Sequence, residues 1–283
     1  MHEFNATPGM HQRMMKSLVI TTAYALAFAA CQSPGQQSTT EPGAWPQGTI
    51  VDLTHSFDGS TIYWPTEAGF ILHEGGKGWQ EAGYYYEANS FEAAEHGGTH
   101  LDAPVHFSEG QWSTDEVPLD RLMGPAVVVD VSAKALEFPD YQVSVQDFMD
   151  WEAANGTLPG GSIVIIRTGY FQLWPNRAEY LGTDLRGPEA IPALHFPGLH
   201  PEAARWLASE RSIHAIGLDT PSIDYGQSSL FEAHQALFAA NIPVFENVAN
   251  LGNLPETGFD VIALPMKIGG GSGGPLRIVA IVR

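Results

Sequence analysis

The chain contains the run His96-Gly97-Gly98-Thr99-His100-Leu101-Asp102-Ala103-Pro104-Val105-His106, and this run decides how the rest of the sequence is interpreted. Its three histidines and its aspartate stand at even positions, so an extended backbone would project all four to one side. A helix would also align His96 with His100, but the Gly-Gly pair and the proline disfavour a helix. Gly98 would leave room for an ion or for close backbone approach. We therefore expect the four side chains to converge on one point of an extended segment.

Imidazole and carboxylate are ligands that divalent zinc, manganese and iron prefer. His96, His100 and Asp102 suffice as three protein ligands, which leaves one coordination position for water and lowers the pKa of that water to roughly 7. His106 then remains for proton transfer, the usual task of an imidazole near neutral pH. The alternative is that these are ordinary surface polar groups clustered by chance, which is uncommon for four such residues within eleven positions.

The first forty residues do not resemble part of a folded domain. Arg13 and Lys16 precede an apolar stretch at 18–30, and Cys31 follows at once. This pattern predicts a secretory signal at 1–31, too short for a confident membrane span. Residues 28–31 resemble the lipobox of bacterial lipoproteins, which implies a lipid anchor through Cys31 and a periplasmic location. Plain secretion with a leftover cysteine is the alternative.

Composition bounds the remainder of the chain. Residues 32–45 are expected to form a flexible linker, and 46–283 a single domain without repeats or breaks. Cys31 is the only cysteine, so neither an intrachain disulfide nor a thiolate metal site in the mature chain can form. Without Glu3, Arg13 and Lys16 of the leader, 31 acidic and 11 basic residues remain, a charge of −20. Such a charge disfavours nucleic acid and anionic lipid as partners.

The periodicity of the domain predicts a β-rich α/β fold. Short runs rich in Val, Ile and Leu indicate strands, at 49–53, 70–73, 84–94, 126–131, 162–168, 214–218, 243–246, 260–266 and 276–282. The runs at 127–129 and 163–166 have the pattern of strands buried on both faces. Helices are expected at 145–155, 200–210 and 231–240. The glycine-rich stretch at 269–274 lacks the lysine and strand-to-helix context of a phosphate loop, and is expected to be a flexible connection.

The chain also resembles a known family. The pattern His-x-Gly-Thr-His-x-Asp-x-Pro-x-His, complete at 96–106, is the signature of the cyclase-like metal hydrolases, which include bacterial kynurenine formamidases and isatin hydrolases. Residues 51–54 resemble the opening strand of the family, and Trp64-Pro65 resembles its substrate-side tryptophan. The segments at 219–224 and 241–247 are similar to later parts of it. The resemblance extends from about residue 49 to the C-terminus.

The resemblance implies a fold and a set of roles. The fold is a swivelling β/β/α domain, usually assembled as dimers or tetramers. His96, His100 and Asp102 match the ligands of a first metal, and Asp102 bridges to a second metal whose other ligands match His234 and Glu246. His106 matches the general acid/base. The implied cofactor is zinc or manganese, with two ions per chain.

From the residues alone, the second metal site has modest support. A lone helical histidine such as His234 is more often structural, whereas Glu246 in an apolar strand is costly to bury unpaired. Trp64 could stack on an aromatic substrate or belong to the core. Asp219 and Asp224 flank a Pro-Ser turn and are expected to act as turn residues and local caps.

The expected activity is metal-dependent hydrolysis of an amide C–N bond in a small molecule, as in the conversion of N-formylkynurenine to kynurenine and formate. Three features depart from the formamidases: the leader, extra segments around 170–200, and Thr66 where glycine is expected. Isatin hydrolysis is the leading alternative, although that branch, with one metal, lacks the second-site glutamate. A non-catalytic periplasmic binding protein and a metal scavenger are alternatives of other classes.

Overall fold

The computed structural model describes residues 47–283, and it is built on an eight-stranded sheet. Four strands run parallel at its centre: β7 (Met123–Asp130), β9 (Ile163–Arg167), β11 (Ala215–Leu218) and β12 (Val244–Glu246). Four more are antiparallel to their neighbours: β6 (His100–Asp102), β13 (Phe259–Pro265), β14 (Gly273–Val282) and β1 (Thr49–Asp52).

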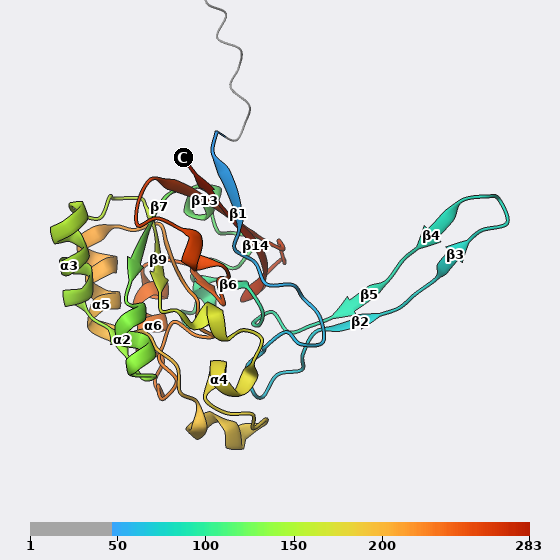
Figure 1. The fold of residues 1–283 in the computed structure, drawn as a ribbon, viewed down its shortest axis with the longest axis horizontal. Helices are drawn as coiled ribbons and strands as arrows, with labels where there is room; N and C mark the ends of the chain where they lie inside the picture. The colour runs from blue at the N-terminus through green and yellow to red at the C-terminus, as the bar shows by residue number, and fades with distance from the viewer. Residues whose placement is uncertain (1–46) are drawn as a thin grey trace, which may run out of the picture. The chain divides into compact units, whose positions relative to one another are not determined.

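The long strand β14 closes most of this sheet into a barrel. The last four residues of β14 pair with β1, and its first residues, from Gly273, pair with β6. Because β6 also pairs with β12 at the other end of the sheet, the strands from β14 round to β6 form a closed ring, and β1 extends it at one edge. Figure 1 shows β1, β13 and β14 side by side, with the helices on the far side of β7 and β9.

Alternation along the central strands separates two apolar cores. Val127 and Val129 of β7 face a core shared with α3 (Val145–Asn155), α5 (Pro201–Trp206) and α6 (Glu232–Ala239). Val128 faces a second core, which draws residues from every strand of the ring and therefore fills the barrel interior. A strand buried on both faces is the physical reason for its continuous apolar run. The prediction of such strands is confirmed.

The remaining elements are short. They are β2 (Ile71–His73), β3 (Lys77–Trp79), β4 (Tyr85–Glu87), β5 (Ser90–Glu92), η1 (Pro104–His106), α1 (Leu119–Leu122), α2 (Ser132–Glu137), β8 (Gln142–Val143), η2 (Tyr170–Leu173), α4 (Arg177–Leu181), η3 (Pro188–Ala193), β10 (Gly198–Leu199), η4 (Leu207–Arg211) and η5 (Leu251–Asn253). The elements from η2 to η3 occupy the extra segments and form a third apolar cluster with Ile62 and Trp64.

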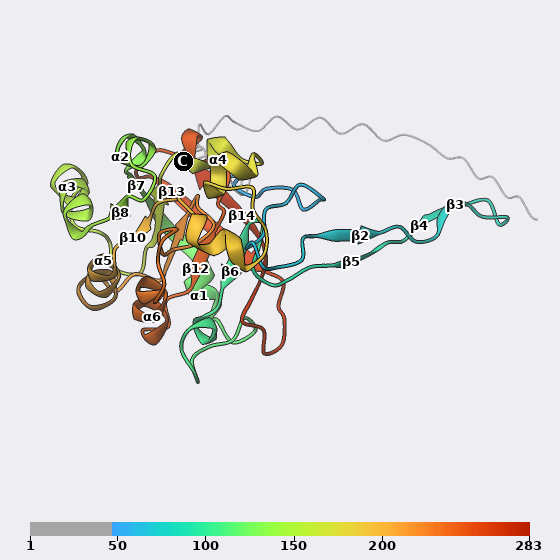
Figure 2. The same ribbon diagram turned by 90° about the horizontal axis from the view of Figure 1, so that it is seen from below.

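One hairpin extends away from the barrel. β2 pairs with β5, and β3 pairs with β4, in two successive two-stranded ribbons. We call residues 71–92 the arm. Figures 1 and 2 show from two directions that the arm projects well beyond the body that carries the helices.

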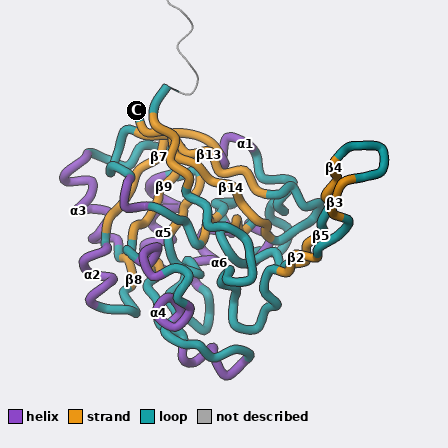
Figure 3. The backbone as a smooth tube through the Cα atoms, turned by 45° about the vertical axis from the view of Figure 1, so that its right-hand side comes forward, coloured by secondary structure: helices purple, strands orange, loops and turns teal. Residues whose placement is uncertain are grey.

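Most predicted elements are confirmed, within a few residues at their ends. The helix at 145–155 forms as expected, with the Asp147 carboxylate accepting hydrogen bonds from the backbone N–H and hydroxyl of Ser144. The single strand expected at 84–94 is wrong, because it is divided into β4 and β5. The flexible connection at 269–274 is partly wrong, since Gly273 and Gly274 begin β14. In the tube view of Figure 3, β14 runs unbroken beside β13.

The predicted signal segment, Cys31 and the linker lie outside the described residues. Within residues 47–283, no helix has the length and apolar character to cross a membrane.

Candidate metal centre

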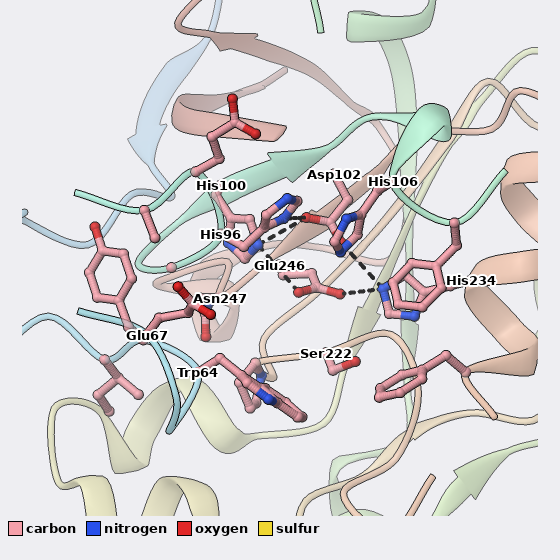
Figure 4. A pocket seen from close by; sticks show the side chains of 18 residues that line it. Trp64, Glu67, His96, His100, Asp102, His106, Ser222, His234, Glu246 and Asn247 are labelled. Atoms are coloured by element: carbon pink, nitrogen blue, oxygen red, sulfur yellow. Dashed lines mark hydrogen bonds and ion pairs between the residues drawn. The ribbon is translucent and has the colours of Figure 1, made fainter. Parts of the chain in front are cut away.

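A cavity of about 380 Å³ lies beside β6 and gathers all seven side chains that the sequence singled out. Figure 4 shows them together. They are Trp64, His96, His100, Asp102, His106, His234 and Glu246. Two come from β6, and the others from the loops before and after it, from α6 and from the end of β12. Closure of the barrel brings β6 and β12 together and thus joins residues more than a hundred positions apart.

The run at 96–106 is not one extended segment, so that expectation is wrong. Gly98 has a left-handed backbone with φ +57°, β6 covers only three residues, and the backbone then turns into η1. A side chain at Gly98 would approach the ring of Phe57 to 2.6 Å. Gly98 therefore serves close packing rather than an ion. The four polar side chains still converge, because the turns before and after β6 direct His96 and His106 back over the strand.

Asp102 occupies the centre of the cluster. Its Oδ1 lies 2.7 Å from Nδ1 of His96 and 3.0 Å from Nε2 of His100, and its Oδ2 lies 3.2 Å from Nε2 of His234. Burial would raise the pKa of this carboxyl, but the surrounding histidines hold its pKa well below the ordinary value. Asp102 is therefore an anion that three imidazoles share.

The buried ring of His100 is oriented for metal ligation. Its Nδ1–H donates to the carbonyl oxygen of Gly98 at 2.9 Å, which leaves the lone pair on Nε2. That Nε2 lies 3.0 Å from Asp102 and 3.4 Å from Glu246, yet it makes no hydrogen bond. Burial lowers the pKa of His100, and the two carboxylates outweigh burial and raise it to about 9. A lone pair that faces two carboxylates requires a proton or a cation between them, so the donor set fits a divalent metal.

His234 repeats this arrangement from the opposite side. Its Nδ1 lies 2.6 Å from Oδ2 of Asp224, a carboxylate that can only accept, and its Nε2 faces Asp102 and Glu246. A histidine ligand held by a carboxylate through its other nitrogen is the usual support of a metal site. The interpretation of Asp224 as a local cap is incomplete. It does cap α6, through the N–H groups of Ala233 and His234, but it also orients the ring.

Glu246 completes the set. Its carboxylate is buried, and Oε1 accepts the backbone N–H of Ile223 at 2.7 Å. Burial and the charge of Asp102 raise the pKa of Glu246. The cost of burying this group in an apolar strand is thus only partly met by hydrogen bonding, which leaves a favourable position for a cation.

Two groups of three residues bring ligand atoms within 4.8 Å of one another. One comprises His100, Asp102 and Glu246, and the other comprises His96, Asp102 and His106. Both contain Asp102, as a bridging residue requires. The grouping differs from the implied first set, because Glu246 rather than His96 lies beside His100.

His106 is a neutral imidazole at the edge of the cluster. Its ring stacks on that of His96, with centroids 3.9 Å apart and planes 19° from parallel. Burial is the main reason that the pKa of His106 falls to about 4, so the ring is neutral at pH 7. A neutral imidazole beside the cluster can accept a proton.

Aromatic side chains also line the cavity, and one of them, Phe107, packs against His106 and His234 of the cluster. Trp64 lines it and also packs edge-on against Phe196, at 6.4 Å between centroids, so it is both a core residue and a wall residue. Phe107 and Phe231 also line the cavity, 5.2 Å apart. Flat apolar surfaces that line the same cavity as a polar cluster suit a small aromatic ligand that carries one polar bond.

Asp219, the other aspartate expected to act as a turn residue, lies outside the metal cluster. Asp219 is fully buried and accepts four hydrogen bonds, from the N–H groups of Thr168, Gly169 and Phe171 and from the Thr168 hydroxyl. It fixes the loop after β9 and does not reach the metal cluster. Its role is structural, as the sequence predicted.

Comparisons with known proteins identify relatives of this chain. The family described as putative cyclase matches residues 51–225, more than half of the chain. An isatin hydrolase of Roseibium aggregatum is 33% identical over 71% of this chain and 76% of its own length. A kynurenine formamidase of Salinibacter ruber is 29% identical over 81% of this chain and 96% of its own length.

The solved structure of isatin hydrolase A from Labrenzia aggregata, bound to benzyl benzoate, is 34% identical. It superimposes with a TM-score of 0.74 over 83% of this chain and 93% of that one. The fold and the resemblance drawn from the sequence are thereby confirmed. The chain belongs to the cyclase family.

Proposed function

We propose that this protein hydrolyses the amide C–N bond of a small aromatic substrate, with divalent cations bound at the cluster around Asp102. The observation that carries the proposal is the orientation of two buried imidazoles. His100 and His234 are each held through Nδ1 and direct Nε2 at the carboxylates of Asp102 and Glu246. Relatives in the family are hydrolases of small molecules with such a bond.

The cation site follows from the donors present. In the assignment that the family resemblance implies, His96, His100 and Asp102 would hold one ion, and Asp102, His234 and Glu246 a second, with Asp102 shared. The distances in this chain also bring Glu246 within reach of the ion beside His100. Imidazole and carboxylate donors suit zinc or manganese. A bound divalent cation supplies a Lewis acid that polarises a carbonyl oxygen and lowers the pKa of water.

Side chains of this protein carry out proton transfer and hold the substrate. Water adds its oxygen to the amide carbon, the C–N bond breaks, and the leaving nitrogen gains a proton. His106, neutral at pH 7, accepts the proton of the water and returns it to the nitrogen. Trp64, Phe107 and Phe231 hold the aromatic part of the substrate and exclude water from that side.

The substrate class proposed first is an N-formylated aniline such as N-formylkynurenine. Glu246 supports it, because the second ligand set matches the formamidases in the resemblance drawn from the sequence. Isatin, a cyclic amide, is the second candidate, favoured by the 33% identity to an isatin hydrolase.

Steady-state kinetics on both substrates test the proposal. Metal-loaded protein should hydrolyse N-formylkynurenine with a higher kcat/KM than isatin, and EDTA should abolish both activities. The reverse order of kcat/KM would assign the chain to the isatin branch. If neither compound reacted, and His106→Ala bound ligand as wild type does, a binding protein would replace the enzyme. A zinc or manganese dissociation constant weaker than micromolar would exclude metal scavenging.

We further propose that the chain is exported and lipid-anchored through Cys31, and that it assembles as a dimer or tetramer. The leader pattern supports the first proposal and the family resemblance supports the second. Labelling with a fatty-acid analogue tests the anchor: wild type should incorporate the label, and Cys31→Ser should not.

A further inference from the structure

The glycine-rich segment 269–274, which leads into β14, is held firmly beside the metal cluster. Ser272 is its only residue with a side chain. The carbonyl oxygens of the two residues that flank Ser272 share the hydroxyl hydrogen of Thr114, at 3.0 and 3.1 Å. The carbonyl oxygen of Ser272 itself accepts the Ala103 N–H at 2.8 Å. The Ser272 hydroxyl is therefore held at a defined place next to β6.

Glycine on either side of Ser272 lets two polar side chains approach the segment. A β carbon at Gly271 would lie 2.7 Å from Oε1 of Glu95, and a β carbon at Gly273 would lie 2.6 Å from Cε1 of His96. Both distances are too short for real side chains, so any larger residue would displace Glu95 or the His96 ring. The glycines thus allow Glu95 and His96 to pack against this backbone.

Hydrogen bonds connect Glu95 to the metal cluster through Ser272. Oε2 of Glu95 accepts both the N–H and the hydroxyl of Ser272, at 2.9 and 2.7 Å. Oγ of Ser272 lies 2.9 Å from Nε2 of His96. Nδ1 of the same ring lies 2.7 Å from Oδ1 of Asp102. The chain of contacts runs from a carboxylate in the cavity wall to the anion at the centre of the cluster.

The single hydrogen of the Ser272 hydroxyl decides which nitrogen of His96 can bind a cation. Because this hydrogen is donated to Glu95, Oγ can only accept from His96, and Nε2 must carry a hydrogen. The nitrogen left for a cation is Nδ1, which faces Asp102. His100 and His234 have the opposite arrangement, since each is held through Nδ1 and presents Nε2.

Building on the metal centre of the proposed function, we propose that Glu95 and Ser272 are positioning residues that make His96 bind its cation through Nδ1. A group that holds the second nitrogen of a histidine ligand fixes the tautomer and the orientation of the ring. Without Glu95, the Ser272 hydroxyl is free to donate to Nε2. The ring can then carry its hydrogen on Nδ1, where it opposes the cation.

Zinc affinity, measured by competition with a chromophoric chelator, tests the two positioning residues. Ser272→Ala and Glu95→Ala should each weaken zinc binding at the His96 site about 10- to 100-fold. Glu95→Gln keeps an acceptor oxygen and should bind zinc more tightly than Glu95→Ala. Ser113→Ala is the matched control and should bind zinc as wild type does. The Ser113 N–H and hydroxyl also donate to one glutamate oxygen, Oε2 of Glu116 at 3.1 and 3.0 Å, but Ser113 contacts no histidine through the hydrogen bonds of the described structure.

Nuclear magnetic resonance of zinc-loaded protein labelled with ¹⁵N-histidine identifies the ligating nitrogen. Signals of His96 are assigned by their absence from His96→Gln. Wild type should show zinc on Nδ1 of His96 and a hydrogen on Nε2, the reverse of the pattern at His100 and His234. Circular dichroism verifies that each variant folds.

The possible results separate this inference from the proposed function. Zinc on Nε2 of His96, wild-type affinity in Ser272→Ala and Glu95→Ala, or an equal loss in Ser113→Ala would overturn the positioning role and leave the metal centre in place. A wild type that binds no zinc would overturn the proposed function, and the positioning role with it.

Discussion

Oδ2 of Asp224 lies 2.6 Å from Nδ1 of His234, at the buried N-terminus of α6. The same carboxylate accepts the backbone N–H groups of Ala233 and His234. One aspartate thus starts the helix and fixes the orientation of an imidazole that the helix carries. Rotation of that ring would withdraw its Nε2 from Asp102 and Glu246.

Asp224→Asn should weaken metal binding at the second site about 10- to 100-fold. The amide oxygen can still cap α6, but it no longer presents a charged acceptor to His234. Competition with a chromophoric zinc chelator measures the change. Ser222→Ala is the control, because Ser222 lines the cavity without contacting His234 through any hydrogen bond of the described structure. Equal zinc affinity in Asp224→Asn and wild type would remove the positioning role.

His106→Ala should lower kcat on the best amide substrate about 10²- to 10⁴-fold and leave the metal content unchanged. The expectation follows from a neutral ring at the edge of the cluster that exchanges protons without holding the cation. His195→Ala is the control, a surface histidine paired with Asp140 at 2.8 Å. Loss of metal from His106→Ala would instead make His106 a ligand, as its place in the group with His96 and Asp102 allows.

His55 should make the stability of the fold depend on pH. Its ring stacks on Trp174 at 4.1 Å, and burial lowers its pKa from 6.5 to about 4. Between pH 6.5 and 4 the unfolded chain binds a proton at His55 that the folded chain does not bind. The contribution of neutral His55 to the free energy of unfolding is therefore complete above pH 6.5 and is lost as the pH falls toward 4. After allowance for partial exposure, the loss is roughly 1–2 kcal/mol.

His55→Phe keeps an aromatic ring on Trp174 and removes the titration. Urea unfolding at a series of pH values should show a smaller decline of the free energy of unfolding in this variant between pH 6.5 and 4.5. Parallel declines in the two proteins would show that other groups govern acid stability.

Asp219→Ala should destabilise the fold by about 3–5 kcal/mol, because it leaves four donors around Thr168, three of them buried, without an acceptor. Asp219→Asn, which keeps one acceptor oxygen, should cost less. Urea unfolding at pH 7 compares the three proteins. A loss below 1 kcal/mol for Asp219→Ala would mean that water replaces the carboxylate, contrary to its complete burial.

Much of the site could be predicted from the sequence because its centre is local. His96, His100, Asp102 and His106 lie in one short run whose composition already specifies metal chemistry. Glu246 was detectable as a carboxylate in an apolar strand. The role of Asp224 was not, because it depends on the meeting of a turn with α6, and a turn aspartate has many ordinary uses.

In the fold, too, the features that depend on local sequence could be predicted, and those that depend on long-range pairing could not. Strands buried on both faces, such as β7 and β9, have continuous apolar runs, and the capped helix α3 was placed correctly. Closure of the barrel depends on the pairing of β14 with β6, which no local pattern specifies. The arm was also missed, because its three consecutive tyrosines, Tyr84 to Tyr86, have the composition of a buried strand although they are exposed.

The metal content of the purified protein tests the account most directly. Elemental analysis of wild type loaded with zinc or manganese should give two ions per chain, and Asp102→Asn, which removes the shared anion, should lose both. One ion per chain would contradict the bridged pair. A wild type without bound metal, or an Asp102→Asn variant that retained both ions, would contradict the assignment of this cluster as the metal centre.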